Sequence, residues 1–389
     1  MSPFWVKMSR GYRWRKLRRG QQLVDIETQG VEHVRDAIAA GHGVLVAPNH
    51  STHYDSEALY VAFDRISQPV YFMTAWQVFE MSTAFERWLM QRMGCFSIDR
   101  ESTDRKAFKQ AIEVLRNEPH PLVIFPEGDI YHITDRVTTF REGAAAIALS
   151  ATKRCERPIT VIPCAIKFWY LEDPAGRLTS VADRLEAQFH IRPQLGLSLR
   201  ERIYRLAEAL LALKELDYIG HTREGEVRQR INFLTETIVA RLENEYALKI
   251  SGSKVPERVK GLRQSIIKKA EGDLPKNGNR ESFYRQLELH MDDLFFVMQL
   301  YSYPGDYLNE GASVERIAET LDKLEEDVLG VDLPSVHGRR KVTIRFGAPI
   351  PVSTDGEKRR GSGELTQTVQ EAVQVLMDEL NRSYDSAEN

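Results

Sequence analysis

The feature that most constrains the fold is a regular alternation of short apolar runs and helix-period segments between residues 21 and 170. The apolar runs have the length of buried strands, and the segments between them place apolar residues such as Ala107, Ala111 and Leu115 on one helical face. We expect strands at 43–48, 70–74, 95–99, 121–125 and 159–166. Alternating strands and helices favour a largely parallel sheet with right-handed crossovers. In such a sheet, functional residues lie just beyond the carboxyl ends of the strands.

The pattern changes after residue 170. Ser198 and Glu201 have the spacing of a capping box, and apolar stripes at helical spacing follow this box and begin again at Val227 and Val314. Strand signal is almost absent from residues 171–337. This stretch is therefore predicted to consist of amphipathic helices.

A strand pattern returns in VTIRFGAPIPV (342–352), ahead of a last amphipathic helix. The fold class that we predict is α/β, with a mostly parallel mixed sheet flanked by helices. Residues 21–170 and 338–385 would form this domain, and 171–337 would be a large all-helical insertion.

The first 20 residues form a separate basic and aromatic segment. They hold seven basic side chains, no acidic ones, and Phe4, Trp5, Tyr12 and Trp14, although the whole chain has a net charge of −3. That near-neutral total argues against a nucleic-acid binder. Each basic residue near an anionic leaflet gains ~1 kcal/mol, and Trp and Tyr favour the interfacial zone. Residues 1–20 are thus expected to contact a membrane surface, with a solvated tail or an arm packed on the domain as alternatives.

Apolar runs, the start of the chain and the cysteines indicate where in the cell the protein is expected. No apolar run reaches the ~18–20 residues that span a bilayer, and the start of the chain has no apolar signal-peptide centre. Cys95, Cys155 and Cys164 have unrelated spacings, which fit neither a disulfide framework nor a C-x-x-C site. We expect a cytoplasmic protein that is peripheral on the cytoplasmic face of the membrane. The apolar helix near 292–303 is expected in the insertion's own core, with acyl-chain or bilayer contact as the alternative.

A candidate catalytic pair follows the strand at 43–48. His50 and Asp55 would lie ~140° apart on one continuous helix, so they converge only if the residues between them turn. Asn49, Ser51 and Thr52 are turn-forming types. An Asp that accepts from one imidazole nitrogen leaves the other nitrogen free to act as a base. A histidine that merely satisfies a hydrogen bond is the alternative.

Four blocks lie near the ends of the expected strands: NHSTHYD (49–55), GCFSIDR (94–100), FPEG (125–128) and VIPCAI (161–166). With these blocks the sequence resembles the glycerolipid acyltransferase family, whose best-known members acylate lysophosphatidic acid. The order and the spacing of the blocks both match the family. The resemblance covers about residues 30–170 and the late strand at 342–352.

The resemblance implies transfer of a fatty acyl group from acyl-CoA or acyl-carrier protein to the hydroxyl of a lysophospholipid-type acceptor in phospholipid biosynthesis. The expected acceptor is 1-acylglycerol-3-phosphate. His50 would be the general base, Asp55 would orient it, and neither a metal nor a cofactor beyond the acyl donor is expected.

The substrate contacts that the resemblance implies come from Arg100, Glu127, Gly128, Gly94 and Thr52. Arg100 could hold a phosphate bidentately. Glu127 could hold an acceptor hydroxyl or position Arg100, and backbone N–H groups near Gly128 could supply further anion contacts.

This sequence departs from the family pattern after FPEG. Asp129, Ile130 and Tyr131 stand where the family usually has a Thr-Arg-Ser-like run, so Arg136 or Arg141 could take over an anion-binding role. Thr52 stands where Ser is commoner, and the long helical stretch is foreign to the short members of the family.

Three other functions stay open at this point. The chain could acylate a different lipid acceptor, or it could be a non-catalytic membrane-associated scaffold. A metal hydrolase would use His50, His53 and Asp55, with His132 as a further ligand.

Overall fold

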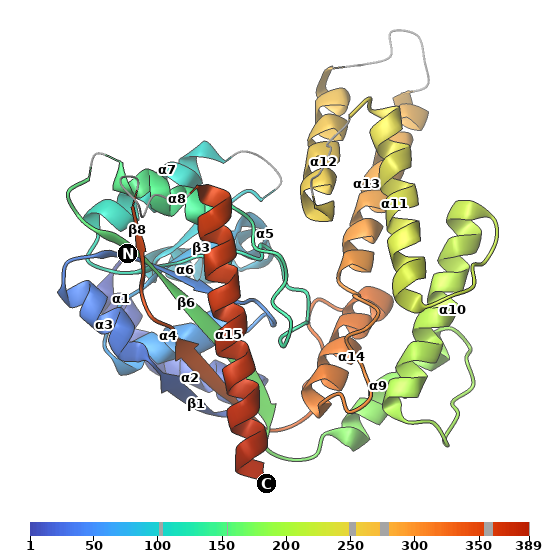
Figure 1. Ribbon diagram of the computed structural model, residues 1–389, viewed down its shortest axis with the longest axis horizontal. Coiled ribbons are helices and arrows are strands. Elements are labelled where there is room, and N and C mark those ends of the chain that lie inside the picture. The colour runs from blue at the N-terminus through green and yellow to red at the C-terminus, as the bar shows by residue number, and fades with distance from the viewer. Residues whose placement is uncertain (101–103, 154, 249–253, 273–279, 354–360, 389) are drawn as a thin grey trace. The chain divides into compact units, whose positions relative to one another are not determined.

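The computed structural model describes residues 1–100, 104–153, 155–248, 254–272, 280–353 and 361–388 (Figure 1). The chain divides into two compact units. The α/β unit consists of Met1–Arg177, Val314–Lys323 and Asp332–Asn389, and the helical unit consists of Leu178–Ser313 and Leu324–Val331. This division differs from the expected one, because residues 1–20 and the first part of the helix at 314 belong to the α/β unit.

The α/β unit is built on one mixed sheet in the order β1-β7-β6-β2-β5-β3-β4, with β8 paired to β6. β2 and its neighbours β5 and β6 are parallel, as are β3 with β4 and β5, whereas β7 and β8 run antiparallel to β6. The predicted fold class, a mostly parallel mixed sheet flanked by helices, is confirmed. The strands are β1 (Leu23–Gln29), β2 (Gly43–Pro48), β3 (Tyr71–Ala75), β4 (Cys95–Ile98), β5 (Leu122–Val123), β6 (Ile159–Tyr170), β7 (Arg340–Phe346) and β8 (Ile350–Val352).

Helices cover both faces of this sheet. Because side chains alternate along a strand, Val44 and Val46 of β2 pack in a core with α2, α3 and α4 on one face, whereas Leu45 and Ala47 pack with α7, α8 and α15 on the other. The helices of the unit are α1 (Pro3–Met8), α2 (Arg10–Gly20), α3 (Val31–Ala39), α4 (Asp55–Arg65), α5 (Trp76–Met81), α6 (Ala84–Arg92), α7 (Arg105–Asn117), α8 (Gly143–Thr152) and α15 (Ser362–Glu388).

The basic and aromatic segment forms α1 and α2, which pack on the α/β unit as an arm. Val6 and Leu17 are buried in the core. Arg13 is also buried, and its guanidinium pairs with Asp64 at 2.5 Å. The solvated-tail alternative is therefore wrong.

The helical unit agrees with the predicted absence of strands, since no described residue of 171–337 is in a strand. The predicted capping box of Ser198 and Glu201 is present at the start of α10. Leu294 and Val297 of α13 are fully buried in a core with α11 and α12, which favours the core interpretation of that helix. Helices α9 (Ala175–Gln188), α10 (Leu199–Ile219), α11 (Val227–Glu245), α12 (Val255–Gly272), α13 (Arg280–Tyr301) and α14 (Val314–Leu329) lie in this stretch. Among the described residues, no helix combines the length and the apolar character needed to cross a membrane.

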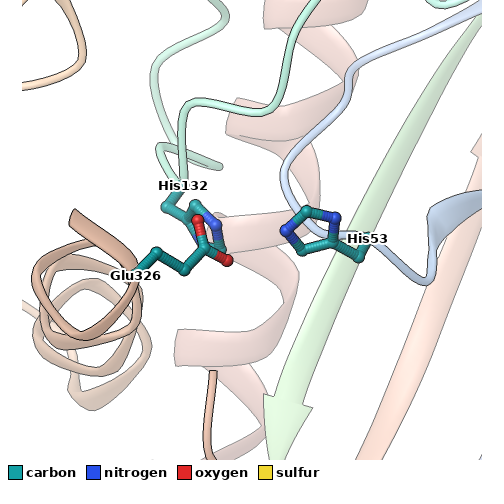
Figure 2. Close-up of side chains that lie close together, drawn as sticks. All are labelled: His53, His132 and Glu326. Atoms are coloured by element: carbon teal, nitrogen blue, oxygen red, sulfur yellow. The ribbon is translucent and has the colours of Figure 1, made fainter. Parts of the chain in front are cut away.

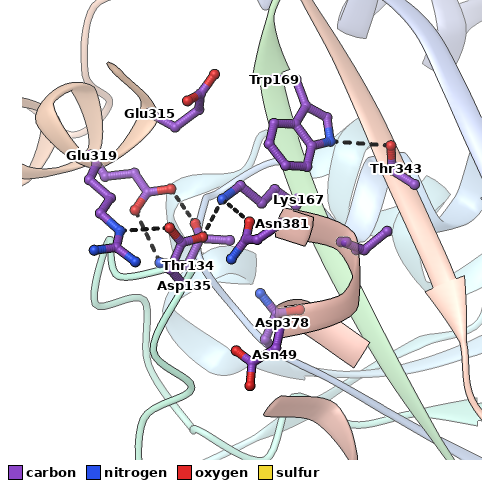
Figure 3. A network of polar contacts seen from close by, with 12 residues as sticks. Asn49, Thr134, Asp135, Lys167, Trp169, Glu315, Glu319, Thr343, Asp378 and Asn381 are labelled. Carbon is purple, nitrogen blue, oxygen red and sulfur yellow. Dashed lines mark hydrogen bonds and ion pairs between the residues drawn. The ribbon is translucent and has the colours of Figure 1, made fainter. Parts of the chain in front are cut away.

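A buried charge network holds the long loop after β5 against the rest of the α/β unit (Figure 3). The Lys167 ammonium of β6 donates to Asp135 and, at 2.6 Å, to Asn381 of α15. The other oxygen of Asp135 accepts from Arg316 of α14 at 2.7 Å, and Thr134 donates to Glu319 one turn further along that helix. Burial alone would raise the pKa of Asp135, but the Lys167 and Arg316 charges hold it below its usual value.

Removing one partner from this network should cost much of the unit's stability. The side chains of Lys167 and Asp135 are 2% and 5% exposed, so Asp135→Ala leaves a buried ammonium without its carboxylate and should lower the free energy of unfolding by about 3 kcal/mol or more. Urea titration measures the change. The control is Asp36→Ala, because Asp36 and its partner Arg35 are 70% and 64% exposed and such pairs contribute about 0.5 kcal/mol. Equal effects of the two variants would refute a stabilising role for Asp135.

Candidate active site

The turn between β2 and α4 brings His50 and Asp55 together, as the sequence predicts. His50 Nδ1 lies 3.0 Å from Asp55 Oδ2. The Asp55 side chain is fully buried and its Oδ2 also accepts from the backbone N–H groups of Ser51 and Thr52, at 2.7 and 2.9 Å. Because an ionised carboxylate only accepts hydrogen bonds, Nδ1 carries the imidazole proton and Nε2 has the free lone pair. The His50 ring remains 19% exposed.

Asn49 fixes the start of this turn to β6. Its side-chain amide donates to the Ile166 carbonyl at 3.1 Å, and its amide oxygen accepts from the Ile166 N–H at 2.7 Å. These two bonds continue the β2–β6 ladder beyond Pro48, the last paired residue of β2. Asn49 was expected only as a turn former, and its pairing depends on a strand more than a hundred residues later, which no local pattern could reveal.

Glu127 holds the His50 turn from the other side. Its buried carboxyl accepts the His50 backbone N–H at 2.7 Å and the Thr138 hydroxyl, and Phe125 of the same loop stacks on the His50 ring at 4.0 Å between centroids. One of the two roles expected for Glu127, positioning of Arg100, is not observed, because its oxygens contact His50 and Thr138. The roles of Phe125 and Thr138 were not foreseen.

Burial changes the ionisation of Glu127. It raises the pKa of this carboxyl to about 8, against the opposing effect of the Thr138 and His50 hydrogen bonds and with a smaller contribution from the negative charge of Asp55. Glu127 is therefore largely protonated at neutral pH, and only one full negative charge, that of Asp55, lies beside the imidazole.

Arg100 reaches across the end of β3 to the loop that carries Glu127. Its guanidinium donates to the Gly128 carbonyl at 2.6 Å and lies 3.3 Å from a carboxylate oxygen of Asp129. Partial burial works to raise the pKa of Asp129, but Arg100, and more weakly Arg141, hold it below its usual value. The segment 127–129 thus links His50 to Arg100.

Arg141 lies against Gly128. Gly128 has φ +76°, and a Cβ atom there would meet the Arg141 guanidinium at 2.6–2.8 Å, so this position needs glycine for two reasons. The Gly128 N–H donates to Phe125 within the turn. This N–H is therefore already paired, the expected anion contact from backbone groups near Gly128 stays a prediction, and Arg100 and Arg141 on either side of Asp129 are candidate anion ligands.

Two expected substrate contacts have structural roles. Gly94 precedes β4 and so lies at the amino end of the strand, opposite to Arg100. Its φ is +103°, and a Cβ atom would lie 2.8 Å from the Val70 carbonyl. Thr52 donates its hydroxyl to Asp55 and accepts the Tyr54 N–H, both at 3.2 Å, so it completes the turn.

The ligands proposed for a metal hydrolase fall into two pairs. His50 pairs with Asp55, whereas the rings of His53 and His132 lie beside each other with centroids 5.9 Å apart (Figure 2). Within the part of the chain that the structure describes, His50 and Asp55 belong to no group of three or more possible metal ligands.

Comparison with known proteins agrees with this arrangement. Residues 25–167 match the model of the acyltransferase family. This stretch of the α/β unit is therefore similar to the acyltransferases. A 1-acyl-sn-glycerol-3-phosphate acyltransferase from Streptococcus pneumoniae is 34% identical over 117 residues, which cover 30% of this chain and 40% of that relative. The chain therefore aligns with less than half of the length of the curated relative. The matched range contains every residue of the candidate site from Asn49 to Arg141 and ends within β6.

The raised pKa of Glu127 should make the stability of the α/β unit depend on pH. A carboxyl whose pKa rises from 4.5 to about 8 binds its proton more tightly in the folded state, so the free energy of unfolding should fall as the pH rises from about 5 to 8. Glu127→Gln cannot ionise. Its stability relative to the wild type should therefore increase with pH across this range, by up to a few kcal/mol.

Chemical denaturation at several pH values measures this difference. Hydrogen bonds that the variant loses lower its free energy of unfolding by the same amount at every pH. Only the change with pH of the difference between the variant and the wild type is therefore diagnostic. Parallel curves for the wild type and Glu127→Gln would show that Glu127 ionises normally.

Proposed function

We propose that this protein transfers a fatty acyl group from acyl-CoA or acyl-carrier protein to the hydroxyl of a lysophospholipid, with 1-acylglycerol-3-phosphate as the acceptor. The observation that carries the proposal is the connection of a histidine–aspartate pair to an arginine through one short loop, Glu127–Asp129. A base and an anion ligand held at one sheet edge suit an acceptor with both a hydroxyl and a phosphate. The similarity to the acyltransferase family and the lipid-acylating relative support the same reaction.

His50 performs the proton transfers in this reaction. Its Nε2 takes the proton of the acceptor hydroxyl as the alcohol oxygen forms a bond to the thioester carbonyl carbon. Asp55 keeps the ring in the required tautomer and stabilises the imidazolium that forms. The C–S bond then breaks, and the imidazolium returns its proton to the departing thiolate. The acceptor hydroxyl is itself the nucleophile, so no acyl-enzyme is required.

Glu127 acts here as a positioning residue. Its neutral carboxyl fixes the His50 backbone, and its protonation avoids a second negative charge that would hold the imidazole proton more tightly. Arg100 and Arg141 bind the acceptor phosphate. Because Arg100 already pairs with Asp129, the phosphate must take over this contact.

The acceptor is a lipid, so the enzyme would work at the surface of a membrane, which we place at its cytoplasmic face. Exposed cations of α1 and α2, such as Lys7, Arg15, Arg18 and Arg19, support attraction to anionic lipid. Arg10 and Arg13 pair with Asp64, and Lys16 pairs with Glu57, so these side chains contribute less to that attraction than the sequence alone suggests.

Loss of the base should abolish most of the activity. We expect His50→Ala to lower kcat by about 10²–10⁴-fold while the protein stays folded. His120→Ala, at the amino edge of the same sheet, is the matched control and should retain its kcat. A chelator should leave the wild-type rate unchanged. An active His50→Ala enzyme would contradict this mechanism. A wild-type enzyme that loses its activity on chelation would contradict it as well.

Substitutions at the anion contact should move KM in opposite directions. Arg100→Ala removes a charge-assisted contact that is made in the ground state, so KM for the phosphorylated acceptor should rise by about 10–100-fold. Asp129→Asn removes the competing carboxylate and should lower KM. Steady-state kinetics with varied acceptor measure both changes. An unchanged KM in Arg100→Ala, with a reduced kcat alone, would place Arg100 in support of the fold or of the transition state.

A further inference from the structure

The helices α5 and α6 leave a large apolar surface exposed. None of the residues 76–92, all of which the structure describes, is buried. Five large apolar side chains of this segment are exposed, and we call them the α5–α6 face: Trp76, Val78, Met81, Phe85 and Trp88. Met81 and Phe85 are 71% and 66% exposed. The half-buried Phe79, Leu89 and Met90 attach these helices to the core. The exposed apolar side chains make no such contact, and a contiguous exposed apolar surface is typical of an interaction site.

The α5–α6 face continues onto α1. Trp88 makes an edge contact with Trp5 at 4.9 Å between centroids, and Phe4 contacts Trp5 at 5.5 Å. Phe4 and Met8 of α1 are themselves more than half exposed. Of the eleven large apolar side chains that are exposed in the described part of the α/β unit, eight lie on α1, α2, α5 and α6. They are therefore gathered in one region.

Basic side chains accompany this apolar surface. Lys7 of α1 and Arg87 and Arg92 of α6 are exposed, and the Arg92 guanidinium lies 5.5 Å from the centre of the Trp88 ring. The exposed cations of α2 follow directly in the chain. Apolar and tryptophan side chains together with cations fit the boundary of an anionic lipid bilayer.

The place of α5 in the fold connects this face to the chemistry. α5 begins directly after β3, at the carboxyl edge of the sheet. His50 and Glu127 follow β2 and β5, which are parallel to β3 and lie next to it in the sheet order. The α5 part of the face and the candidate base thus emerge from the same edge.

We propose that the α5–α6 face, together with Phe4 and Met8, docks the enzyme on an anionic lipid bilayer. This inference rests on the proposed function, since it places a lipid-acylating site beside its substrate. Apolar side chains enter the interfacial zone and neighbouring cations contact the headgroups. The bilayer, rather than a protein partner, is the occupant that matches both the apolar and the cationic parts of this surface.

The test compares vesicle binding by full-length variants. Removal of residues 1–20 is unsuitable, because Val6 and Leu17 are part of the core. The double variant Met81→Ser/Phe85→Ser changes only exposed side chains, and Leu171→Ser/Val375→Ser, at positions 47% and 52% exposed in the same unit, is the matched control. Flotation uses vesicles of phosphatidylcholine alone and of equal parts phosphatidylcholine and phosphatidylglycerol.

We expect the wild type to prefer the anionic vesicles, and the Met81→Ser/Phe85→Ser variant to lose about tenfold or more in its partition coefficient. The control variant should bind as the wild type does. Acyl transfer to an acceptor presented in vesicles should fall with binding, whereas transfer to the same acceptor in detergent micelles should not change.

Equal vesicle binding by the double variant and the wild type would overturn the docking role while leaving the proposed function intact. Face-dependent binding by a protein without acyltransferase activity would support the docking role and refute the proposed function. A wild-type dimer that the double variant dissociates, seen by sedimentation velocity without vesicle binding, would instead make this face an interface between two copies and overturn the proposal.

Discussion

The buried carboxylate of Asp55 is the constraint on which the rest of the site depends. It is the first residue of α4, and one of its oxygens accepts from the His50 ring and from two backbone N–H groups of the turn. A buried charge is tolerated only when several donors satisfy it. The same bonds that satisfy it close the turn and orient the imidazole, so the folding of this turn also sets the orientation of the His50 ring. Asn49 and Glu127 then fix the turn to β6 and to the loop after β5.

The loop after β5 is fixed by contacts from β6 and α14 as well as by the contact of Glu127 with the His50 turn. Lys167, Arg316 and Glu319 contact its residues Thr134 and Asp135 from β6 and α14. This arrangement accounts for the division of the chain, in which the first part of α14 belongs to the α/β unit. A sequence that lacks the usual Thr-Arg-Ser-like run after FPEG still brings Arg141 to Gly128, because the loop returns under the constraint of this network.

Much of the fold could be predicted from apolar runs and periodicity, because β2, β5 and β6 are buried along their whole length and form continuous apolar segments. β1 was missed, since LVDIETQ is a partly buried edge strand with polar residues at alternate positions in its second half. The His50–Asp55 pair was predictable because the contact is local. Gly94 lies at the opposite end of β4 from Arg100, because a block that spans a strand has one residue at each end of it. The positions of Arg100 on Gly128 and Asp129, the protonation of Glu127 and the exposure of α5 and α6 depend on long-range packing that no local pattern encodes.

The central claim is that a lipid hydroxyl, and not water, accepts the acyl group. The most direct measurement is mass spectrometry of the products formed by the purified protein from 1-acylglycerol-3-phosphate and an acyl-CoA or acyl-carrier-protein donor. We predict a diacyl product that carries the donor's acyl chain, formed in step with the free thiol. Release of free fatty acid without that product, or no consumption of either donor, would contradict it.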